Sequence, residues 1–177
     1  MKIILKSVKP KFVLRHITLN DLDEYLRISL DSAVKKGILK VPKTKAEARK
    51  EINEIMTSYR EKKPKDEDFA IDVDGKFIGL VSIHGLSYGY EKHKGVLGYW
   101  IAKEYRGKGI ATMAVKMVTK YAFKKYKLIR ITGFCRTFNK ASARVLEKAG
   151  YKCEGILRKN KFKDGKYLHD MLFAKVK

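Results

Sequence analysis

The sequence has few cysteines and histidines, and it has no long apolar run. Its 177 residues include two cysteines, Cys135 and Cys153, and four scattered histidines without the spacing of metal ligands. No apolar run is long enough to span a membrane, and the first run ends at Lys6, too soon for the core of a signal peptide. These absences exclude a disulfide scaffold and predict a cytoplasmic protein with no metal site and no membrane partner.

Acidic residues are scarce relative to basic ones. The chain has 41 Lys and Arg against 19 Asp and Glu, a formal net charge of +22. Residues 106–148 contain 12 of the bases and one acid, Glu147. Such a region favours an anionic ligand. Its charge exceeds what one small ligand needs, which leaves open a solvated face, an RNA-rich partner such as a ribosome, or a lysine-rich composition.

The length and the spacing of apolar residues predict one domain of mixed α/β structure over residues 1–177. We expect strands over residues 11–17, 69–73, 76–84, 95–102, 128–135, 151–157 and 167–176. We expect helices over residues 20–36, 44–60, 112–126 and 139–149. Asp-Gly pairs at 74–75 and 164–165 predict turns. Exposed or connecting loops are expected at 61–68, 85–94 and 159–166.

A glycine-rich turn stands between the predicted strand 95–102 and the helix that follows it. Its sequence is Arg106-Gly107-Lys108-Gly109-Ile110-Ala111. The glycines let the backbone approach a ligand closely, and the free N–H groups at the start of a helix bind anions. The spacing differs from that of a P-loop, and the acidic residue of a dinucleotide fold is missing. The turn therefore predicts a phosphate-bearing ligand, with a plain tight turn as the alternative.

A second block downstream begins at Asn139, an expected helix N-cap, and ends with Gly150-Tyr151. With Arg-x-x-Gly-x-Ala at 106–111 and Asn-x-x-Ser…Glu-Lys-x-Gly-Tyr at 139–151, the chain resembles the GNAT acyl-CoA N-acyltransferases. The stretch Gly98-Tyr99-Trp100-Ile101 is similar to the RimJ/RimL branch, which acetylates protein N-termini. The resemblance covers residues 14–173. It implies the GNAT fold, a mixed and mainly antiparallel central sheet flanked by helices.

The resemblance implies acetyl-CoA as the cosubstrate. The strand backbone would pair with the pantetheine arm, the turn would hold the pyrophosphate, and the second helix would face the thioester. The cofactor-binding residues that it implies are Tyr99, Trp100, Ile101, Arg106, Gly107, Lys108, Gly109, Ile110, Ala111, Asn139 and Ser142. Ordinary strand packing is the alternative for the Tyr99 and Trp100 side chains, and a helix cap is the alternative for Asn139.

The catalytic acid departs from the wider family pattern. Many GNAT enzymes have a tyrosine where this chain has Leu146. Ser142 is then the candidate that polarises the thioester or protonates the leaving thiolate, and the alternative is a small residue that lets the cofactor approach. Cys135 would lie near the thioester, either as a contact of the CoA sulfur or as a small buried residue.

The general base is a separate question. Carboxylates that the branch sometimes uses are replaced here by Val96 and Lys161. His84 titrates in a suitable range and is the candidate base, with a structural histidine as the alternative. Asp170 matches an often acidic position of the branch, where a structural role is expected. The run 66–68 (Asp-Glu-Asp) offers either an acidic patch for a cationic acceptor or a solvated loop.

Together these features predict an acetyl-CoA-dependent N-acetyltransferase that acts on a primary amine. A protein N-terminal α-amine is the favoured acceptor, with a ribosomal protein as one candidate. The alternatives are a small-amine or aminoglycoside acetyltransferase, and a non-catalytic module that binds CoA or RNA. The sequence indicates neither the acceptor nor the oligomeric state.

Overall fold

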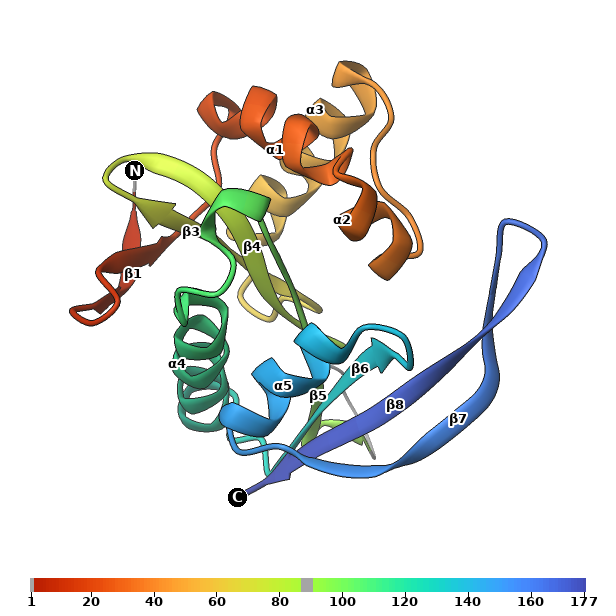
Figure 1. Cartoon of the computed structure of the whole chain (residues 1–177). Helices are drawn as coiled ribbons and strands as arrows, with labels where there is room; N and C mark the ends of the chain where they lie inside the picture. Colours follow the sequence, from red (N-terminus) through yellow and green to blue (C-terminus); the bar gives the residue numbers. More distant parts are fainter. Residues whose placement is uncertain (1, 87–90) are drawn as a thin grey trace.

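An eight-stranded sheet runs through the protein, as the computed structural model in Figure 1 shows. The structure describes residues 2–86 and 91–177. The strands are β1 (Ile3–Ser7), β2 (Phe12–Arg15), β3 (Glu67–Val73), β4 (Lys76–His84), β5 (Lys94–Ile101), β6 (Arg130–Arg136), β7 (Lys152–Lys163) and β8 (Lys166–Val176). Their spatial order is β1-β2-β3-β4-β5-β6-β8-β7, and within the described ranges only β5 and β6 pair in parallel. The predicted mixed, mainly antiparallel sheet is confirmed.

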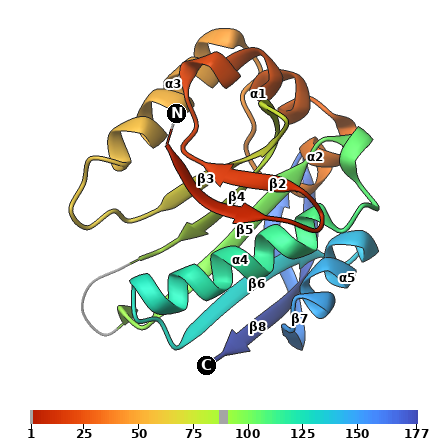
Figure 2. The ribbon, with the colours of Figure 1, turned by 90° about the vertical axis from the view of Figure 1, so that its left-hand side faces the viewer.

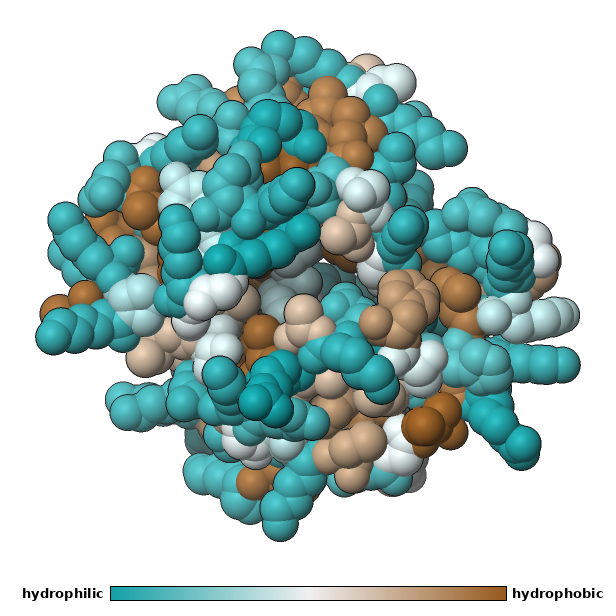
Figure 3. Space-filling view, in the orientation of Figure 1, coloured by the Kyte–Doolittle hydropathy of each residue, from teal (hydrophilic) through white to brown (hydrophobic). Residues whose placement is uncertain are grey.

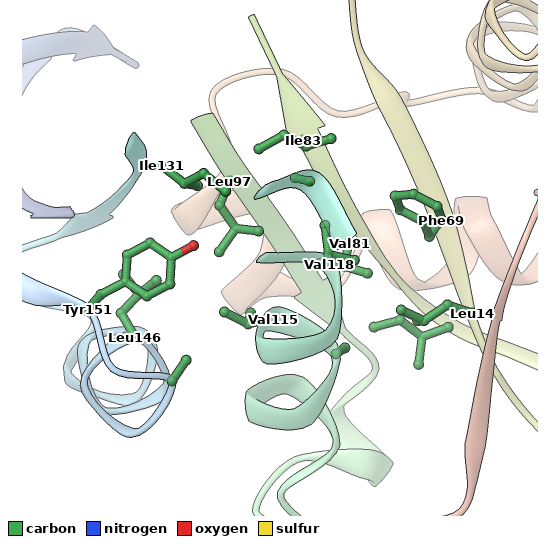
Figure 4. Packing of buried hydrophobic residues seen from close by; sticks show 14 of the residues in the cluster. Leu14, Phe69, Val81, Ile83, Leu97, Val115, Val118, Ile131, Leu146 and Tyr151 are labelled. Atoms are coloured by element: carbon green, nitrogen blue, oxygen red, sulfur yellow. The ribbon is translucent and has the colours of Figure 1, made fainter. Parts of the chain in front are cut away.

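Helices cover both faces of this sheet. The helices are α1 (Leu22–Ser29), α2 (Ser32–Gly37), α3 (Lys45–Ser58), α4 (Ile110–Lys125) and α5 (Lys140–Lys148). Figure 2 shows α4 and α5 in front of the strands, where their apolar residues pack with those of the sheet into one core cluster, part of it drawn in Figure 4. The first three helices contribute to a second cluster. Successive residues of β3 serve both clusters, since Phe69 and Ile71 belong to the first and Ala70 to the second.

The predicted helix 20–36 is wrong as a single element. A short 3-10 helix (Leu19–Asp21) precedes α1, and Asp31 separates α1 from α2. The Asp31 carboxylate accepts hydrogen bonds from the N–H groups of Ala33 and Val34, at 3.0 and 3.2 Å, and so caps a new helix. No helix among residues 2–86 and 91–177 is both long and apolar enough to cross a membrane.

Two predicted loops are also wrong in part. The basic segment 159–166 belongs mostly to a long β7–β8 hairpin, although its turn lies at Asp164-Gly165 as predicted, where both residues have positive φ. Glu67 and Asp68 lie buried in β3 and not in an exposed loop. Strand β1 was not predicted. Part of the expected loop 85–94 lies outside the described residues.

A buried ion-pair cluster joins β2, the second strand, to β3 and to the start of α1. The Arg15 guanidinium is 2% exposed and makes 2.7 Å contacts with Asp21 and with Asp72 on β3. Asp21 also accepts a 2.9 Å hydrogen bond from the backbone N–H of Thr18. One cation therefore satisfies two buried carboxylates and holds the start of α1 against the sheet.

Candidate active site

The site begins where two strands of the sheet part. Strands β5 and β6 pair in register from Lys94↔Arg130 to Leu97↔Gly133. Beyond that point β5 continues to Ile101 beside β4, and β6 continues to Arg136 beside β8. The main chain of β5 from Gly98 onward therefore faces a gap instead of a neighbouring strand, and its polar groups there, other than the Ile101 carbonyl that accepts from Arg106, can pair with a ligand.

A cavity of about 1160 Å³ follows this gap. Figure 3, in the orientation of Figure 1, shows a recess at the middle of the face toward the viewer. Residues from β3, β4, β5 and β6 line the cavity, together with residues of α1, α2, α3 and α5 and the first half of α4. The structure brings all the predicted site residues to its wall except Lys108: His84, Tyr99, Trp100, Ile101, Arg106, Gly107, Gly109, Ile110, Ala111, Asn139 and Ser142.

One end of the cavity is suited to an anion. Gly107 and Gly109 have φ values of +77° and +76°, which residues with a Cβ rarely adopt. Gly109 is the N-cap of α4 and supplies no side-chain acceptor, so the first N–H groups of the helix are left for a ligand. Basic side chains that line the same cavity are Lys40, Arg106, Lys116, Arg136, Arg144 and Lys148.

Both basic side chains of the glycine-rich turn already have partners within the protein. The Arg106 guanidinium lies 2.9 Å from the Asp31 carboxylate and donates to the Ile101 carbonyl at 3.2 Å. This hydrogen bond from Arg106 holds the pKa of Asp31 below its ordinary value. The Lys108 ammonium lies 5.3 Å from the centre of the Tyr105 ring. An anion at this end would therefore meet main-chain N–H groups, while Arg106 holds the turn against the start of α2.

A hydroxyl pair lies at the middle of the gap. The Tyr99 hydroxyl is 3.0 Å from the Ser142 carbonyl and 2.8 Å from the Ser142 hydroxyl. Burial raises the pKa of Tyr99 above its ordinary value, so it is a neutral donor. Asn139 accepts a 3.1 Å hydrogen bond from the Ser142 N–H, as an N-cap does. When Tyr99 donates to the carbonyl, the Ser142 hydroxyl is free to turn its proton toward a ligand.

The other end of the cavity carries acidic and aromatic groups. Its wall includes Tyr25, whose hydroxyl donates to Glu51 at 3.1 Å, and Asp68, which accepts a hydrogen bond from Ser82. Burial raises the pKa values of both carboxyl groups. His84 stands at the end of β4, with Nδ1 3.5 Å from Asp66.

Sequence reasoning considered Asp68 only as part of a short acidic run and missed Tyr25, Glu51 and Ser82. These three residues come from α1, α3 and β4, which meet only in the folded chain. The signal that was available is Ser82, a polar residue within the apolar run of β4.

Cys135 lies on β6, lines the cavity and is 5% exposed, which agrees with the alternative of a small buried residue. Burial raises the pKa of its thiol to about 11. At pH 8 only about one thiol in a thousand is then a thiolate, the form that reacts with alkylating agents.

We therefore expect iodoacetamide at pH 8 to label the exposed Cys153 and to leave Cys135 unmodified. Because deprotonation rises about tenfold per pH unit below the pKa, labelling of Cys135 should increase as the pH is raised toward 10. Peptide mapping by mass spectrometry checks this, with the urea-unfolded chain as the control in which both thiols react. Equal labelling of the two thiols in the folded protein at pH 8 would contradict it.

The chain matches the family described as Acetyltransferase (GNAT) domain over residues 11–152. It therefore belongs to the GNAT acetyltransferase family, as its motifs predicted. The solved structure of Mycobacterium smegmatis RimJ in complex with CoA-disulfide has a TM-score of 0.84 to this protein at 25% identity. That likeness covers 94% of this chain and 82% of RimJ.

Several curated proteins are similar in sequence to part of this chain. YjcK of Bacillus subtilis (strain 168), named a probable N-acetyltransferase, is 41% identical over 109 residues, which are 59% of this chain and 60% of YjcK. YdaF of the same organism, whose name proposes ribosomal N-acetyltransferase activity, is 36% identical over 100 residues, 56% of this chain and 53% of YdaF. The chain thus spans between 53% and 60% of these two relatives. Spermidine N(1)-acetyltransferase of Escherichia coli (strain K12) is 28% identical over 99 residues, 56% of this chain and 52% of that enzyme.

Proposed function

We propose that this protein transfers the acetyl group of acetyl-CoA to a primary amine, with a protein N-terminal α-amine as its acceptor. The observation that carries the proposal is the cavity along the β5–β6 gap, which has main-chain anion donors at one end and the Tyr99–Ser142 pair at its middle. Membership of the GNAT family supports acetyl transfer, and the name of YdaF, a putative ribosomal N-acetyltransferase, supports this acceptor class. We further propose that the protein acts in the cytoplasm, where ribosomal proteins are acceptors within reach.

Each part of the reaction is assigned to residues of the wall. The N–H groups at 107–111 hold the pyrophosphate, the β5 main chain at 99–101 aligns the pantetheine arm, and Asn139 positions Ser142. His84 or water takes a proton from the ammonium group, and the neutral amine attacks the thioester carbon. The carbon–sulfur bond then breaks. Ser142, in hydrogen-bond reach of Tyr99, donates its proton to the CoA thiolate and regains one from the acetylated nitrogen, directly or through water, so that the products are a neutral amide and a free thiol.

The direct test is release of free CoA thiol from acetyl-CoA in the presence of acceptor panels. We expect turnover with peptides that have a free N-terminus and none with the same peptides blocked at the N-terminus. Mass spectrometry locates the acetyl group on the α-nitrogen. Binding of CoA by calorimetry with no acetylation of any peptide or amine would contradict the proposal and favour a module that binds CoA without turnover.

A small amine is the second candidate acceptor. The similarity to spermidine N(1)-acetyltransferase favours it, and so do the carboxylates Glu51 and Asp68 at one end of the cavity. The net charge of +22 repels polycations at longer range and weighs against it. Spermidine and an aminoglycoside in the same thiol-release assay separate the two: a kcat/KM for either that exceeds the best peptide would assign the small-amine activity.

The β7–β8 hairpin is the part of the surface that we propose to contact RNA on the ribosome. Figure 1 shows its tip extending away from the sheet. Phe162 and Tyr167 are 62% and 60% exposed, with ring centroids 5.1 Å apart, and the Lys159 ammonium lies 5.5 Å from the Tyr167 ring. Exposed aromatic rings among basic residues form a surface suited to bases and phosphates.

For this surface we expect the double variant Lys159→Gln/Lys161→Gln to bind a 20-nucleotide RNA hairpin more weakly. The slope of log affinity against log salt should fall by about 2, one for each phosphate that a lysine no longer neutralises. The matched control is Lys120→Gln/Lys124→Gln on α4, which removes the same charge from another exposed surface. Fluorescence anisotropy at several salt concentrations measures both variants. An equal loss of affinity in the two would indicate diffuse charge and contradict a role for the hairpin.

A further inference from the structure

Three residues form a row across the centre of the sheet. Asp68 on β3 is the register partner of Ser82 on β4, and Ser82 is the partner of Gly98 on β5. The Ser82 hydroxyl donates to the Asp68 carboxylate. All three residues line the cavity, and Asp68 is 7% exposed. The row therefore runs from a buried carboxylate to the residue where β5 parts from β6.

Gly98, which has no side chain, leaves space on the sheet surface beside Ser82. A Cβ at position 98 would lie 3.2 Å from the His84 Nε2, so a larger residue would crowd the imidazole and fill the space between Ser82 and the gap. Register pairing of β5 with β6 ends at the preceding residue, Leu97. A ligand group beside Asp68 thus lies on the same side of the sheet as the entrance to the gap, with no side chain from β5 between them.

Asp68 differs from the other buried carboxylates in its partners. Asp21 and Asp72 pair with Arg15, Glu67 pairs with Lys125, and Asp170 pairs with Arg136. Within residues 2–86 and 91–177, Asp68 alone among buried carboxylates has no Lys or Arg in contact, and Ser82 is the hydrogen-bond donor to one of its oxygens. The basic side chain that acts on its charge is His84, at the end of β4. In a chain with 41 basic residues, such a carboxylate is an exception. Buried carboxylates ordinarily require a cation or several donors, and Asp68 lines the cavity, where a ligand can supply them.

We propose that Asp68 is the counter-ion for the ammonium group of the acceptor. The inference rests on the proposed function for the identity of that acceptor, and it names the residue that recognises it. Ser82 orients the carboxylate by holding one oxygen, and the other oxygen accepts a hydrogen bond from a primary ammonium group. The site selects a cationic amine over a neutral alcohol of the same shape, because only the amine compensates the buried charge.

The test uses n-butylammonium chloride and 1-butanol as matched probes of the ligand-free protein. We expect n-butylammonium, but not 1-butanol, to shift the amide NMR signals of Ser82 and Gly98. Asp68→Asn should weaken n-butylammonium binding by roughly tenfold to a hundredfold, the effect of losing a charged hydrogen bond. Asp23→Asn is the control, since it removes the same charge from an exposed position on α1 that does not line the cavity.

The comparison of the two probes uses the unaltered protein. It therefore decides the question even if Asp68→Asn does not fold. Equal binding of 1-butanol, or ammonium-induced shifts centred away from this row, would overturn the inference. Intact ammonium binding with no acetylation of any acceptor would count against acetyl transfer and leave the ammonium site standing. Acetylation by Asp68→Asn with an unchanged acceptor KM would overturn the ammonium site and leave acetyl transfer standing.

Discussion

Replacing Ser142 with alanine is expected to lower kcat for acetyl transfer by about a hundredfold, the usual effect of losing one donor to a developing charge. The Ser142 hydroxyl lies 2.8 Å from that of Tyr99 and is the proposed proton donor to the departing thiolate. The KM for acetyl-CoA should change little, because the anion site at Gly107 and Gly109 is untouched. Tyr99→Phe should lower kcat by a smaller factor, since it removes a group that acts through Ser142. Steady-state kinetics at saturating acceptor measures both.

The core of the same protein offers a matched control. Thr119 and Tyr151 form a buried hydroxyl pair at 2.7 Å, and neither residue lines the cavity. Thr119→Ala and Tyr151→Phe therefore report the cost of losing such a pair for stability alone. We expect them to lower the melting temperature and to leave kcat within about twofold of the unaltered protein. A kcat for Ser142→Ala no lower than that of Thr119→Ala would remove Ser142 from the chemistry.

The largest expected effect on stability is that of Arg15→Ala. This change leaves the carboxylates of Asp21 and Asp72 buried without their cation, which costs about 3–5 kcal/mol in comparable buried pairs. The free energy of unfolding, measured by urea titration with circular dichroism, should fall by that amount. Since folded proteins are stable by about 5–15 kcal/mol, the variant should unfold well below the denaturant concentration that unfolds the original chain.

Arg27 provides the comparison for Arg15. Its guanidinium also contacts two carboxylates, Glu24 at 2.9 Å and Glu104 at 3.0 Å, but its side chain is 46% exposed. Ion pairs in contact with water contribute about 0–1 kcal/mol, so Arg27→Ala should be nearly neutral. If the two arginine variants lose the same stability, burial is not what makes the Arg15 cluster important.

Most of the strands and helices after β1 could be predicted along the chain because local signals mark them. Asp-Gly pairs gave both turns, Thr44 capped α3, and Asn139 capped α5. The glycine-rich turn also carries its own signal, since Gly107 and Gly109 adopt the positive φ that their residue type permits. For these elements the chemistry of a few adjacent residues decides the structure, so one sequence was sufficient.

The errors have a different physical origin. Asp31 was hidden within a helical pattern, yet its carboxylate caps α2 and pairs with Arg106, 75 residues away. The length of the β7–β8 hairpin depends on pairing between the two strands, and the basic residues of 158–163 give no alternation that indicates it. The acidic run 66–68 looked uniform, but Asp68 is buried within β3, whereas Asp66 precedes the strand and is half exposed. Long-range contacts decide each of these.

The gap between β5 and β6 makes two unpaired strand edges face one another inside a single sheet. On the outside of a protein, such edges invite pairing with other chains and lead to aggregation. Here residues of α2, α3 and α5 line the same cavity, so the edges are approached by a slender extended molecule more readily than by a foreign strand. A ligand that pairs with the β5 main chain would act as a short extra strand and add to the β5–β6 pairing, which by itself covers only Lys94–Leu97 of β5. Occupancy of the gap would therefore strengthen the contact between the β1–β5 and β6–β8 parts of the sheet, and the stability of the folded chain should rise with ligand concentration.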